Sequence, residues 1–344
     1  MLCKVTTKNR KTSNKPYKYI IIMTRNRKKQ ESLSYFMKRL IEQLTKNGQH
    51  RTMLHYKATL NSFMRFRDNK DISFKEIGTE EMLSYEAYLK NVAKVCSNTS
   101  SFYLRILRAT YNKAVEKGIA TQQAPFKNVY TGIAKTSKRA IPVTSVSSIK
   151  HLDATHDAKK LSPKEEMARD AFLMSFYLRG ISFIDLAHLR KSDLKDGFIS
   201  YTRSKTGQRL SIRWEKEMQS IVDRYQAETA SSPYLFPFLA SATKRKIRTI
   251  QDKNLDELRL YHNAESRIAY HLKKLGAKIG IKGKLTLYVA RHSWATAARD
   301  NKVALSVISE ALGHNSEATT QIYLRSIQTS EVDDANAKVL AAIR

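Results

Sequence analysis

The sequence has few cysteines, few acidic residues and no long apolar run. Its two cysteines, Cys3 and Cys96, form neither the paired spacing of a zinc site nor the framework of a disulfide-rich secreted domain. This usage is typical of a reducing cytosol. The apolar run Tyr19–Met23 near the start is too short for a signal-peptide core or a membrane span. We therefore expect a soluble intracellular protein.

Acidic residues are outnumbered two to one by basic residues. The 344 residues include 62 Lys and Arg against 31 Asp and Glu, which gives a formal net charge of +31. Such an excess predicts a large polyanionic partner, most simply DNA or RNA. An anionic membrane is disfavoured because no basic amphipathic helix with bulky aromatic anchors is evident. No P-loop motif and no acidic metal cluster is apparent, so we expect no metal and no nucleotide cofactor.

Three polar residues stand in helical, mostly apolar sequence near the C-terminal end: Arg291, His314 and Tyr323. Leu312-Gly313-His314 is typical of a helix end, because glycine suits the left-handed position there. An arginine offers paired donors to phosphate oxygens, a histidine adds a donor, and a tyrosine can be a nucleophile. A capped core helix followed by a surface tyrosine would explain each piece separately, but not their joint order and spacing.

These residues carry a resemblance to a known family. Arg291-His292 with Trp294-Ala-Thr, Leu312-Gly313-His314 and Tyr323 resemble the catalytic core of the tyrosine recombinases, the lambda-integrase-like integrases of phages and transposons. The resemblance implies that Tyr323 attacks the scissile DNA phosphate, forming a 3′-phosphotyrosyl bond and freeing a 5′-hydroxyl. It also implies that Arg291 and His314 stabilise the charge of the transition state.

The resemblance also implies the partners of the protein. They are double-stranded DNA, a homo-tetramer on synapsed DNA and an accessory DNA-bending or directionality factor, with no membrane. The expected location is the cytoplasm of a bacterium, in association with the nucleoid.

The sequence departs from the family pattern at its first catalytic arginine. Aligning Gly180, Asp185 and Leu186 with the family motif puts Ser182 at that position. A branch of the family from mobile elements of anaerobic gut bacteria is similar here. Our hypothesis is that Arg179, three residues earlier, supplies the guanidinium. The alternative is that Arg179 supports the site or binds the DNA backbone, and that the site works with one arginine. Asp185 is expected to orient neighbouring polar groups.

The segment from Phe198 to Ile212 alternates apolar and polar residues on both sides of a turn that contains Gly207, which predicts a β-hairpin. Lys205-Thr206-Gly207 matches the hairpin lysine of the family. Lys205 is therefore the candidate general acid that protonates the leaving 5′ oxygen. The alternative is a solvated turn lysine, which is common in hairpins.

A second departure lies three residues before Arg291, where the family usually has a histidine and this chain has Tyr288. A phenol can donate a hydrogen bond but cannot shuttle protons near neutral pH as an imidazole does. Tyr288 is therefore expected to support the site without transferring protons. The adjacent His292 is expected to be packed.

Helical periodicity predicts a bundle over residues 32–46, 52–67, 79–91 and 97–117. Its apolar stripes form the core, and its basic faces are either solvated surface or a DNA-binding side. The charge of the chain favours DNA, through Lys57 and Arg65 on the second helix and Arg105 and Arg108 on the fourth. In the family a helical core-binding domain occupies this place.

The second half predicts a helix that starts at Ser162-Pro163, the hairpin, and helices over residues 214–225, 256–275 and from Tyr288 onward. The expected fold is mainly α with a small β-hairpin or sheet. The resemblance implies that this fold combines an N-terminal helical SAM-like core-binding domain with an α+β tyrosine-recombinase catalytic domain.

The expected domain organisation has five parts: a basic N-terminal arm over residues 1–30, the helical DNA-binding domain 31–128, a linker 129–143, the catalytic domain 144–330 and a C-terminal helix 331–344. The arm holds ten Lys and Arg and no acidic residue. The linker carries Lys138 and Arg139, which are expected to contact phosphate. In the family the last helix docks on a neighbouring protomer, and the alternative for this chain is that the helix packs on its own domain.

Two other functions fit parts of the sequence. Ser182 and Tyr288 would suit a non-catalytic DNA-binding accessory protein, whereas the intact Lys205, Arg291 and Tyr323 favour an enzyme. A type IB topoisomerase-like nicking and closing activity would use the same chemistry. Integration, excision and inversion of DNA segments remain open as biological roles.

Binding to duplex DNA should weaken steeply as salt rises, because phosphate contacts release counterions. Neutralising about 6–10 phosphates costs roughly 10³- to 10⁵-fold in affinity between about 50 and 200 mM salt. Titrating a labelled duplex at several salt concentrations measures the slope. A flat salt dependence would contradict the expectation that phosphate contacts hold the duplex.

Overall fold

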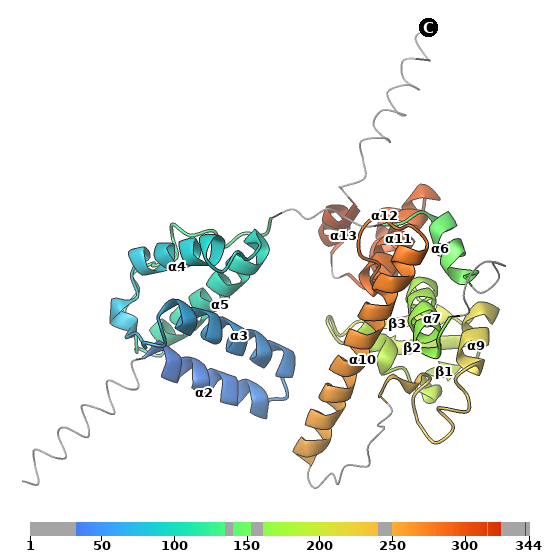
Figure 1. The fold of residues 1–344 in the computed structure, drawn as a ribbon, viewed down its shortest axis with the longest axis horizontal. Helices are drawn as coiled ribbons and strands as arrows, with labels where there is room; N and C mark the ends of the chain where they lie inside the picture. Colours follow the sequence, from blue (N-terminus) through green and yellow to red (C-terminus); the bar gives the residue numbers. More distant parts are fainter. Residues whose placement is uncertain are drawn as a thin grey trace, which may run out of the picture. The chain divides into compact units, whose positions relative to one another are not determined.

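The computed structural model describes residues 32–134, 140–152, 161–239, 250–314 and 316–324, together with residue 341. The chain divides into two compact units, residues 1–136 and 137–344 (Figure 1). Each unit has its own core of buried apolar side chains. The predicted architecture, mainly helical with a small sheet, is confirmed. Among the described residues, no helix has the length and apolar character needed to cross a membrane.

The described part of the N-terminal unit contains four helices and a short 3-10 turn. They are α2 (Leu33–Lys46), α3 (His50–Phe66), η1 (Phe74–Glu76), α4 (Thr79–Asn91) and α5 (Ser97–Glu116). The predicted helices are confirmed, with ends that differ by a residue or two. Thr79 is the first residue of α4, and Gly78 occupies the N-cap position without a side-chain hydrogen bond.

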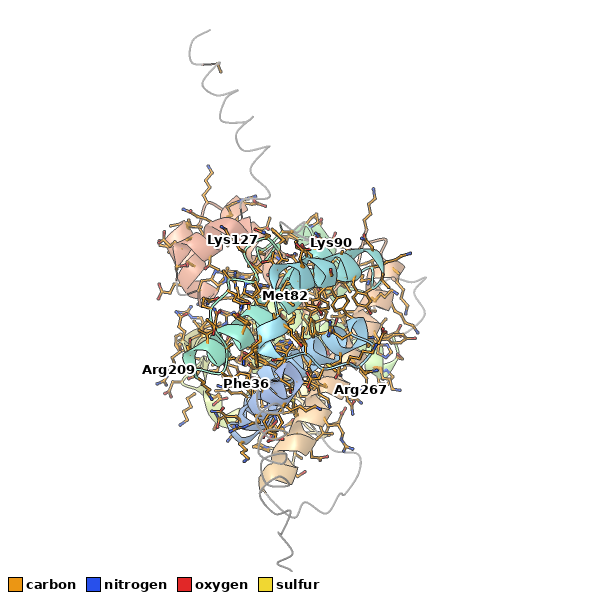
Figure 2. The ribbon with its side chains drawn as sticks, turned by 90° about the vertical axis from the view of Figure 1, so that its left-hand side faces the viewer. Phe36, Met82, Lys90, Lys127, Arg209 and Arg267 are labelled. Atoms are coloured by element: carbon orange, nitrogen blue, oxygen red, sulfur yellow. The ribbon has the colours of Figure 1, made fainter. Side chains whose placement is uncertain are left out.

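The core of this unit is rich in aromatic rings. Phe63 and Tyr85 lie edge to face with ring centroids 5.0 Å apart, and both are fully buried. The hydroxyl of Tyr85 donates to Ser62 at 2.9 Å, so its polar end is satisfied inside the core. Figure 2 shows Phe36 and Met82 among the helices and Lys90 toward their margin. The bundle therefore buries its apolar faces and turns charged side chains outward.

The C-terminal unit is built around α7. Its described residues form the helices α6 (Val143–Lys150), α7 (Pro163–Tyr177), α8 (Phe183–Ala187), α9 (Lys216–Asp223), α10 (Ile250–Lys278), α11 (Leu287–Asp300), α12 (Leu305–Ala311) and α13 (Glu317–Leu324), with 3-10 turns η2 (Lys191–Asp193) and η3 (Pro237–Leu239). Helix α7 is buried on every side from Ala168 to Ser175 and contacts α6, α9, α10 and α11. It is the central helix against which α10 and α11 pack.

Helix α7 begins at Ser162-Pro163, as predicted, and its first turn forms a capping box. The Ser162 side chain accepts from the Glu165 backbone N–H, and the Glu165 carboxylate accepts from the Ser162 N–H in return. The other carboxylate oxygen of Glu165 lies 2.8 Å from Nζ of Lys278 at the end of α10. The hydrogen bond from Lys278, together with those from Ser162, lowers the pKa of Glu165 to about 2. The start of α7 is thereby fastened to the end of α10.

Three antiparallel strands form the sheet in the order β1 (Leu194–Lys195), β2 (Phe198–Thr202), β3 (Arg209–Arg213). Strands β2 and β3 form the predicted hairpin, with Ile199 opposite Ile212 and Tyr201 opposite Leu210. These four side chains are buried, while their neighbours along each strand face outward. Between the strands, Arg203 and Gly207 are joined by a backbone hydrogen bond of 2.8 Å that closes the turn.

Helix α10 extends beyond its predicted end at residue 275 and runs through Gly276 to Lys278. A Cβ on Gly276 would lie 2.8 Å from Cβ of Leu285, so the missing side chain allows the following segment to pack closely. The predicted helix end at Leu312-Gly313 is confirmed, with Gly313 in the left-handed conformation (φ 63°).

Candidate active site

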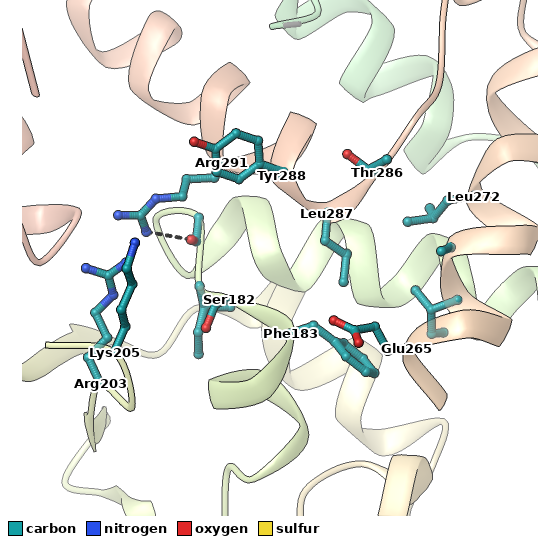
Figure 3. A pocket seen from close by; sticks show the side chains of 14 residues that line it. Ser182, Phe183, Arg203, Lys205, Glu265, Leu272, Thr286, Leu287, Tyr288 and Arg291 are labelled. Atoms are coloured by element: carbon teal, nitrogen blue, oxygen red, sulfur yellow. Dashed lines mark hydrogen bonds between the residues drawn. The ribbon is translucent and has the colours of Figure 1, made fainter. Parts of the chain in front are cut away.

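Arg291 lies at the centre of the candidate site. It projects from α11, is 7% exposed, and donates from Nη1 to the carbonyl oxygen of Gly180 at 2.8 Å (Figure 3). From Nη2 it donates to the carbonyl oxygen of Leu312 at 2.5 Å and lies 3.1 Å from Nε2 of His314. One guanidinium therefore joins the segment after α7, the end of α12 and the histidine.

Two glycines let arginines pack directly on the backbone. Gly180 has φ 79°, and a Cβ there would lie 2.5–2.7 Å from Cγ, Cα and Cβ of Arg291. Gly313 has φ 63°, and a Cβ there would lie 3.0 Å from Cδ of Arg203. Both backbone conformations disfavour a larger residue, and at Gly180 the close approach of Arg291 also excludes one, whereas at Gly313 the Arg203 side chain would have to shift. The glycines of the two motifs are therefore part of how the site is assembled.

Arg203 was not predicted from the sequence to be a site residue. It follows β2 directly, is 8% exposed, and donates from Nη1 to the carbonyl oxygen of Gly313. Two arginines from distant segments, Arg203 and Arg291, thus bind consecutive carbonyls at the end of α12. One signal was present in the sequence. The alternation of β2 puts residue 203 on the buried face shared by Ile199 and Tyr201, and an arginine on a buried face needs a function or a partner.

His314 is neutral, and its proton can be assigned. A guanidinium has donors only, so Nε2 accepts from Arg291 and the proton is on Nδ1. Nδ1 lies 2.8 Å from Oγ1 of Thr320. Burial, together with the positive charges of Arg291, Arg203 and Lys205, lowers the pKa of His314 to about 4.

A cavity of about 350 Å³ lies beside these groups. Figure 3 shows Arg203 and Lys205 extending together from the hairpin toward Arg291, with Tyr288 nearby. The far side of the cavity is mostly apolar and is lined by Phe183, Glu265, Ile268, Leu272 and Leu287. The structure therefore brings together the predicted residues Lys205, Tyr288 and Arg291 with Arg203, and His314 adjoins the two arginines.

Tyr288 is 59% exposed, and its ring meets the buried His292 edge on, with centroids 4.4 Å apart. His292 is 4% exposed, as its expected packing requires. The phenol of Tyr288 thus stands at the cavity while its ring rests on a packed imidazole. This arrangement suits a residue that supports the site.

Ser182 and Asp185 form a polar anchor under the hairpin. The Ser182 hydroxyl donates to one carboxylate oxygen of Asp185 at 2.6 Å, and the Ser204 backbone N–H donates to the other at 2.9 Å. Asp185 is 4% exposed. Ser204 stands between Arg203 and Lys205, so Asp185 fixes the backbone from which both cations extend.

Arg179 is not among the residues that line the cavity. It is partly buried and has a left-handed backbone (φ 56°), one residue before Gly180. Its assignment as the displaced arginine stays a prediction, and Arg203 is a second candidate.

The backbone of Tyr323 lies in α13, but its side chain is outside the described part of the structure. The linker residues Lys138 and Arg139, the arm 1–30 and all of the C-terminal segment 331–344 except residue 341 lie outside it as well. Their predicted roles stay predictions. Among the described residues, no group of three or more His, Cys, Asp or Glu is arranged to hold a metal ion.

The predicted DNA-binding residues of the N-terminal unit lie on two helices that contact each other. Lys57 and Arg65 are exposed on α3. Arg105 is partly buried on α5, and the exposed Arg108 donates from Nη1 to Oγ1 of Thr131 at 2.8 Å. These cations are available on the surface of one bundle, and their contact with DNA stays a prediction.

Comparison with known proteins identifies the family. Residues 32–130 match the phage integrase SAM-like domain, and residues 148–329 match the phage integrase family. The chain belongs to the phage integrase family. The sequence-based prediction of a tyrosine-type site-specific DNA recombinase, made of a SAM-like domain and a catalytic domain, is confirmed.

Relatives and solved structures agree with this assignment. The tyrosine recombinase XerC of Leptospira interrogans is 22% identical over 312 residues, which cover 90% of this chain and 94% of that protein. The fold is similar to that of a lambda integrase dimer bound to a COC′ core site, with TM-score 0.57, 16% identity, and coverage of 85% of this chain and 95% of the integrase. It is also similar to the Tn1549 transposon integrase in complex with a circular intermediate DNA, with TM-score 0.58, 13% identity, and coverage of 84% and 94%.

The lowered pKa of His314 predicts a pH dependence of stability. The folded pKa, about 4, is below the ordinary value of 6.5, so the unfolded chain binds this proton first as pH falls. The contribution of His314 is complete above about 6.5 and is lost as pH falls toward 4. Urea unfolding of the wild type and of His314→Gln should show the wild type losing stability relative to the variant across this window. If the stabilities of the wild type and of His314→Gln change in parallel with pH, the lowered pKa of His314 is contradicted.

Proposed function

We propose that the integrase cleaves and rejoins duplex DNA at one phosphate held by Arg203 and Arg291, with Tyr323 as the nucleophile. The observation that carries the proposal is the convergence of two buried guanidiniums on consecutive carbonyls, next to His314 and Lys205. Tyr323 forms a 3′-phosphotyrosyl bond and releases a 5′-hydroxyl. A 5′-hydroxyl from a partner strand reverses the step, so the bond energy is kept in the covalent link.

Two adjacent positive charges stabilise the transition state more than the ground state, because the phosphate carries more negative charge in the transition state. A phosphate in cleavage gains negative charge on its non-bridging oxygens, and preorganised donors stabilise that charge. Both guanidiniums are buried and held by carbonyls, so they lose little freedom when the phosphate arrives. This supports Arg203 as the second arginine of a site in which Ser182 replaces the usual one.

Lys205 is the proposed general acid. It is exposed at the turn of the hairpin, lines the cavity and shares its backbone anchor, Asp185, with Arg203. A flexible ammonium can reach the leaving 5′ oxygen and protonate it. Tyr288 supports the site through its hydroxyl.

The proposed substrate is double-stranded DNA, bound through phosphate contacts of α3 and α5 in the N-terminal unit and of the linker cations. The working assembly is a homo-tetramer on synapsed DNA, assisted by a DNA-bending or directionality factor. Solved relatives include recombinase dimers on a core site and a tetramer on a Holliday junction, which supports a multimeric assembly. We expect the protein to act at the nucleoid, in the bacterial cytoplasm.

Tyr323→Phe should abolish formation of a covalent protein–DNA complex while leaving duplex binding intact, because only the nucleophilic oxygen is removed. The measurement is a denaturing gel after incubation with nicked duplexes taken from the genomic neighbourhood of the gene. A denaturation-resistant band from the wild type alone is the expected result. A duplex that binds but never yields a band with the wild type would favour a non-catalytic accessory protein.

Arg203→Ala should slow covalent complex formation by roughly 10²- to 10³-fold, the usual cost of removing one preorganised donor to a developing charge. Arg179→Ala should slow it by less than about tenfold, because Arg179 does not line the cavity and so is not expected to donate to the developing charge. Arg213→Ala, at the exposed end of β3, controls for loss of hairpin charge. A large loss of rate in Arg179→Ala with a small loss in Arg203→Ala would instead favour the hypothesis that Arg179 supplies the missing guanidinium.

A further inference from the structure

The charged side chains on the outer face of the three-stranded sheet are all positive. Strands β2 and β3 bury alternate side chains in the core of the C-terminal unit and turn the others outward (Figure 1). With Lys195 of β1, the outward residues form what we call the outer sheet face. It contains three cations (Lys195, Arg209 and Arg213), three hydroxyl groups and one phenylalanine, and no carboxylate.

Phe198 lies between two of these cations. It is paired with Lys195 on β1 and with Arg213 on β3, and directly opposite residues of a sheet share a face. The phenylalanine is 43% exposed, although its side chain is large and apolar. Surfaces that bind nucleic acid combine cations, which pair with phosphates, with exposed aromatic rings. This row of the sheet has that combination.

Two further rows supply the hydroxyl groups and the third cation. Ser200 is opposite Ser211, with their hydroxyl oxygens 3.0 Å apart. In the next row Thr202 is opposite Arg209. Lysine, arginine, serine and threonine are among the side chains that donate to phosphate oxygens. Every row of the outer sheet face therefore holds at least one phosphate donor.

The three cations are not neutralised by the protein itself. Among the residues that the structure describes, none of the three forms an ion pair. Asp193, Asp196 and Glu215 flank the strands along the chain but lie in none of them. The surface of an ordinary soluble domain mixes both signs of charge. The outer sheet face thus offers donors without a charged acceptor, and a phosphate backbone supplies such acceptors.

The dimensions of the outer sheet face fit a short length of DNA backbone. Strands are about 4.8 Å apart and rise about 3.4 Å per residue, so the face is roughly 10 Å wide from β1 to β3 and roughly 14 Å long from Arg209 to Arg213. Each strand of a duplex carries a phosphate about every 3.4 Å of helix axis. The length of the face therefore matches about four phosphates, which is sufficient for each cation to contact one.

We propose that the outer sheet face is a second DNA-binding surface, which holds the phosphate backbone of duplex DNA through Lys195, Arg209 and Arg213. None of these residues lines the cavity. The hairpin connects the two places, because Lys205 at its turn lines the cavity and Arg209 begins β3. Contacts to phosphate add affinity without reading sequence. The inference rests on the proposed function only in that the protein binds duplex DNA.

Replacing the three cations together, as Lys195→Gln with Arg209→Gln and Arg213→Gln, should weaken duplex binding and its salt dependence. Each lost phosphate contact lowers the slope of log affinity against log salt by roughly 0.9, so the slope should fall by roughly 2–3 and the affinity by at least about tenfold at about 0.1 M salt. Arg209→Lys with Arg213→Lys keeps the charges and should lose far less affinity. The measurement is fluorescence anisotropy of a labelled duplex with the full-length protein at several salt concentrations.

The matched control removes three exposed cations from other parts of the same unit, as Lys150→Gln with Lys164→Gln and Lys302→Gln. It has the same net charge as the sheet variant, and thermal unfolding compares the stability of the two. A control that loses as much affinity and slope as the sheet variant would overturn the proposal, because net charge would then explain both. A sheet variant with the affinity and slope of the wild type would also overturn it, and would favour an acidic protein as the partner of this face.

Directed cleavage locates the DNA without removing any cation. Ser211→Cys, in a protein whose Cys3 and Cys96 are replaced by serine, carries an iron–EDTA group in the middle of the outer sheet face. Radicals from this group should cut the bound duplex at a discrete position of its backbone. The same group on Lys150→Cys, on helix α6, is the control. A probe at position 211 that cuts the duplex no more than the probe at position 150 would overturn the proposal.

The failure of this inference is distinguishable from the failure of the proposed function. If the wild type binds no duplex, the proposed substrate is wrong. If the wild type binds duplex and forms the covalent complex, but the sheet variant and the probe behave as their controls do, only the second surface is wrong. Because Arg213 belongs to this surface, Arg213→Ala is compared with Arg203→Ala at saturating duplex, where weaker binding does not limit the rate.

Discussion

The site depends on two buried guanidiniums that bind one loop. Arg291 donates to the carbonyl of Leu312 and Arg203 to that of Gly313. Two positive charges in a partly dry site repel each other and are costly to bury. The carbonyls at the end of α12 offset part of this cost, since the C-terminal end of a helix carries partial negative charge. Under the proposed function, the bound phosphate offsets the rest, because it pairs with both guanidiniums.

This constraint explains why the site draws on segments so far apart in sequence. The carbonyl of Gly180 follows α7, Arg203 follows β2, Arg291 lies on α11, and His314 follows α12. Helix α7 is buried on all sides and positions α10 and α11, while Asp185 fixes the hairpin through Ser204. The backbone from which each arginine extends is therefore fixed by contacts of its own. This arrangement is what electrostatic preorganisation requires.

Much of this could be predicted from the sequence because the relevant signals are local. Helix periodicity, the Ser162 capping box and the hairpin alternation are set by residues within a few positions of one another, and Arg291 and His314 stand in recognisable motifs. Arg203 was missed because its role arises from a tertiary contact. The hairpin must dock on the end of α12 before that side chain meets Gly313. The end of α10 was misjudged for a similar reason, since Gly276 is there to accommodate Leu285 and not to stop the helix.

The central claim is that Arg203 and Arg291 hold the same phosphate. A structure of the Tyr323→Phe protein on a duplex containing its crossover site tests this most directly. The account predicts both guanidiniums on non-bridging oxygens of one phosphate, with Lys205 near the 5′ oxygen. A complex in which Arg179 binds that phosphate while Arg203 contacts only Gly313 would contradict it.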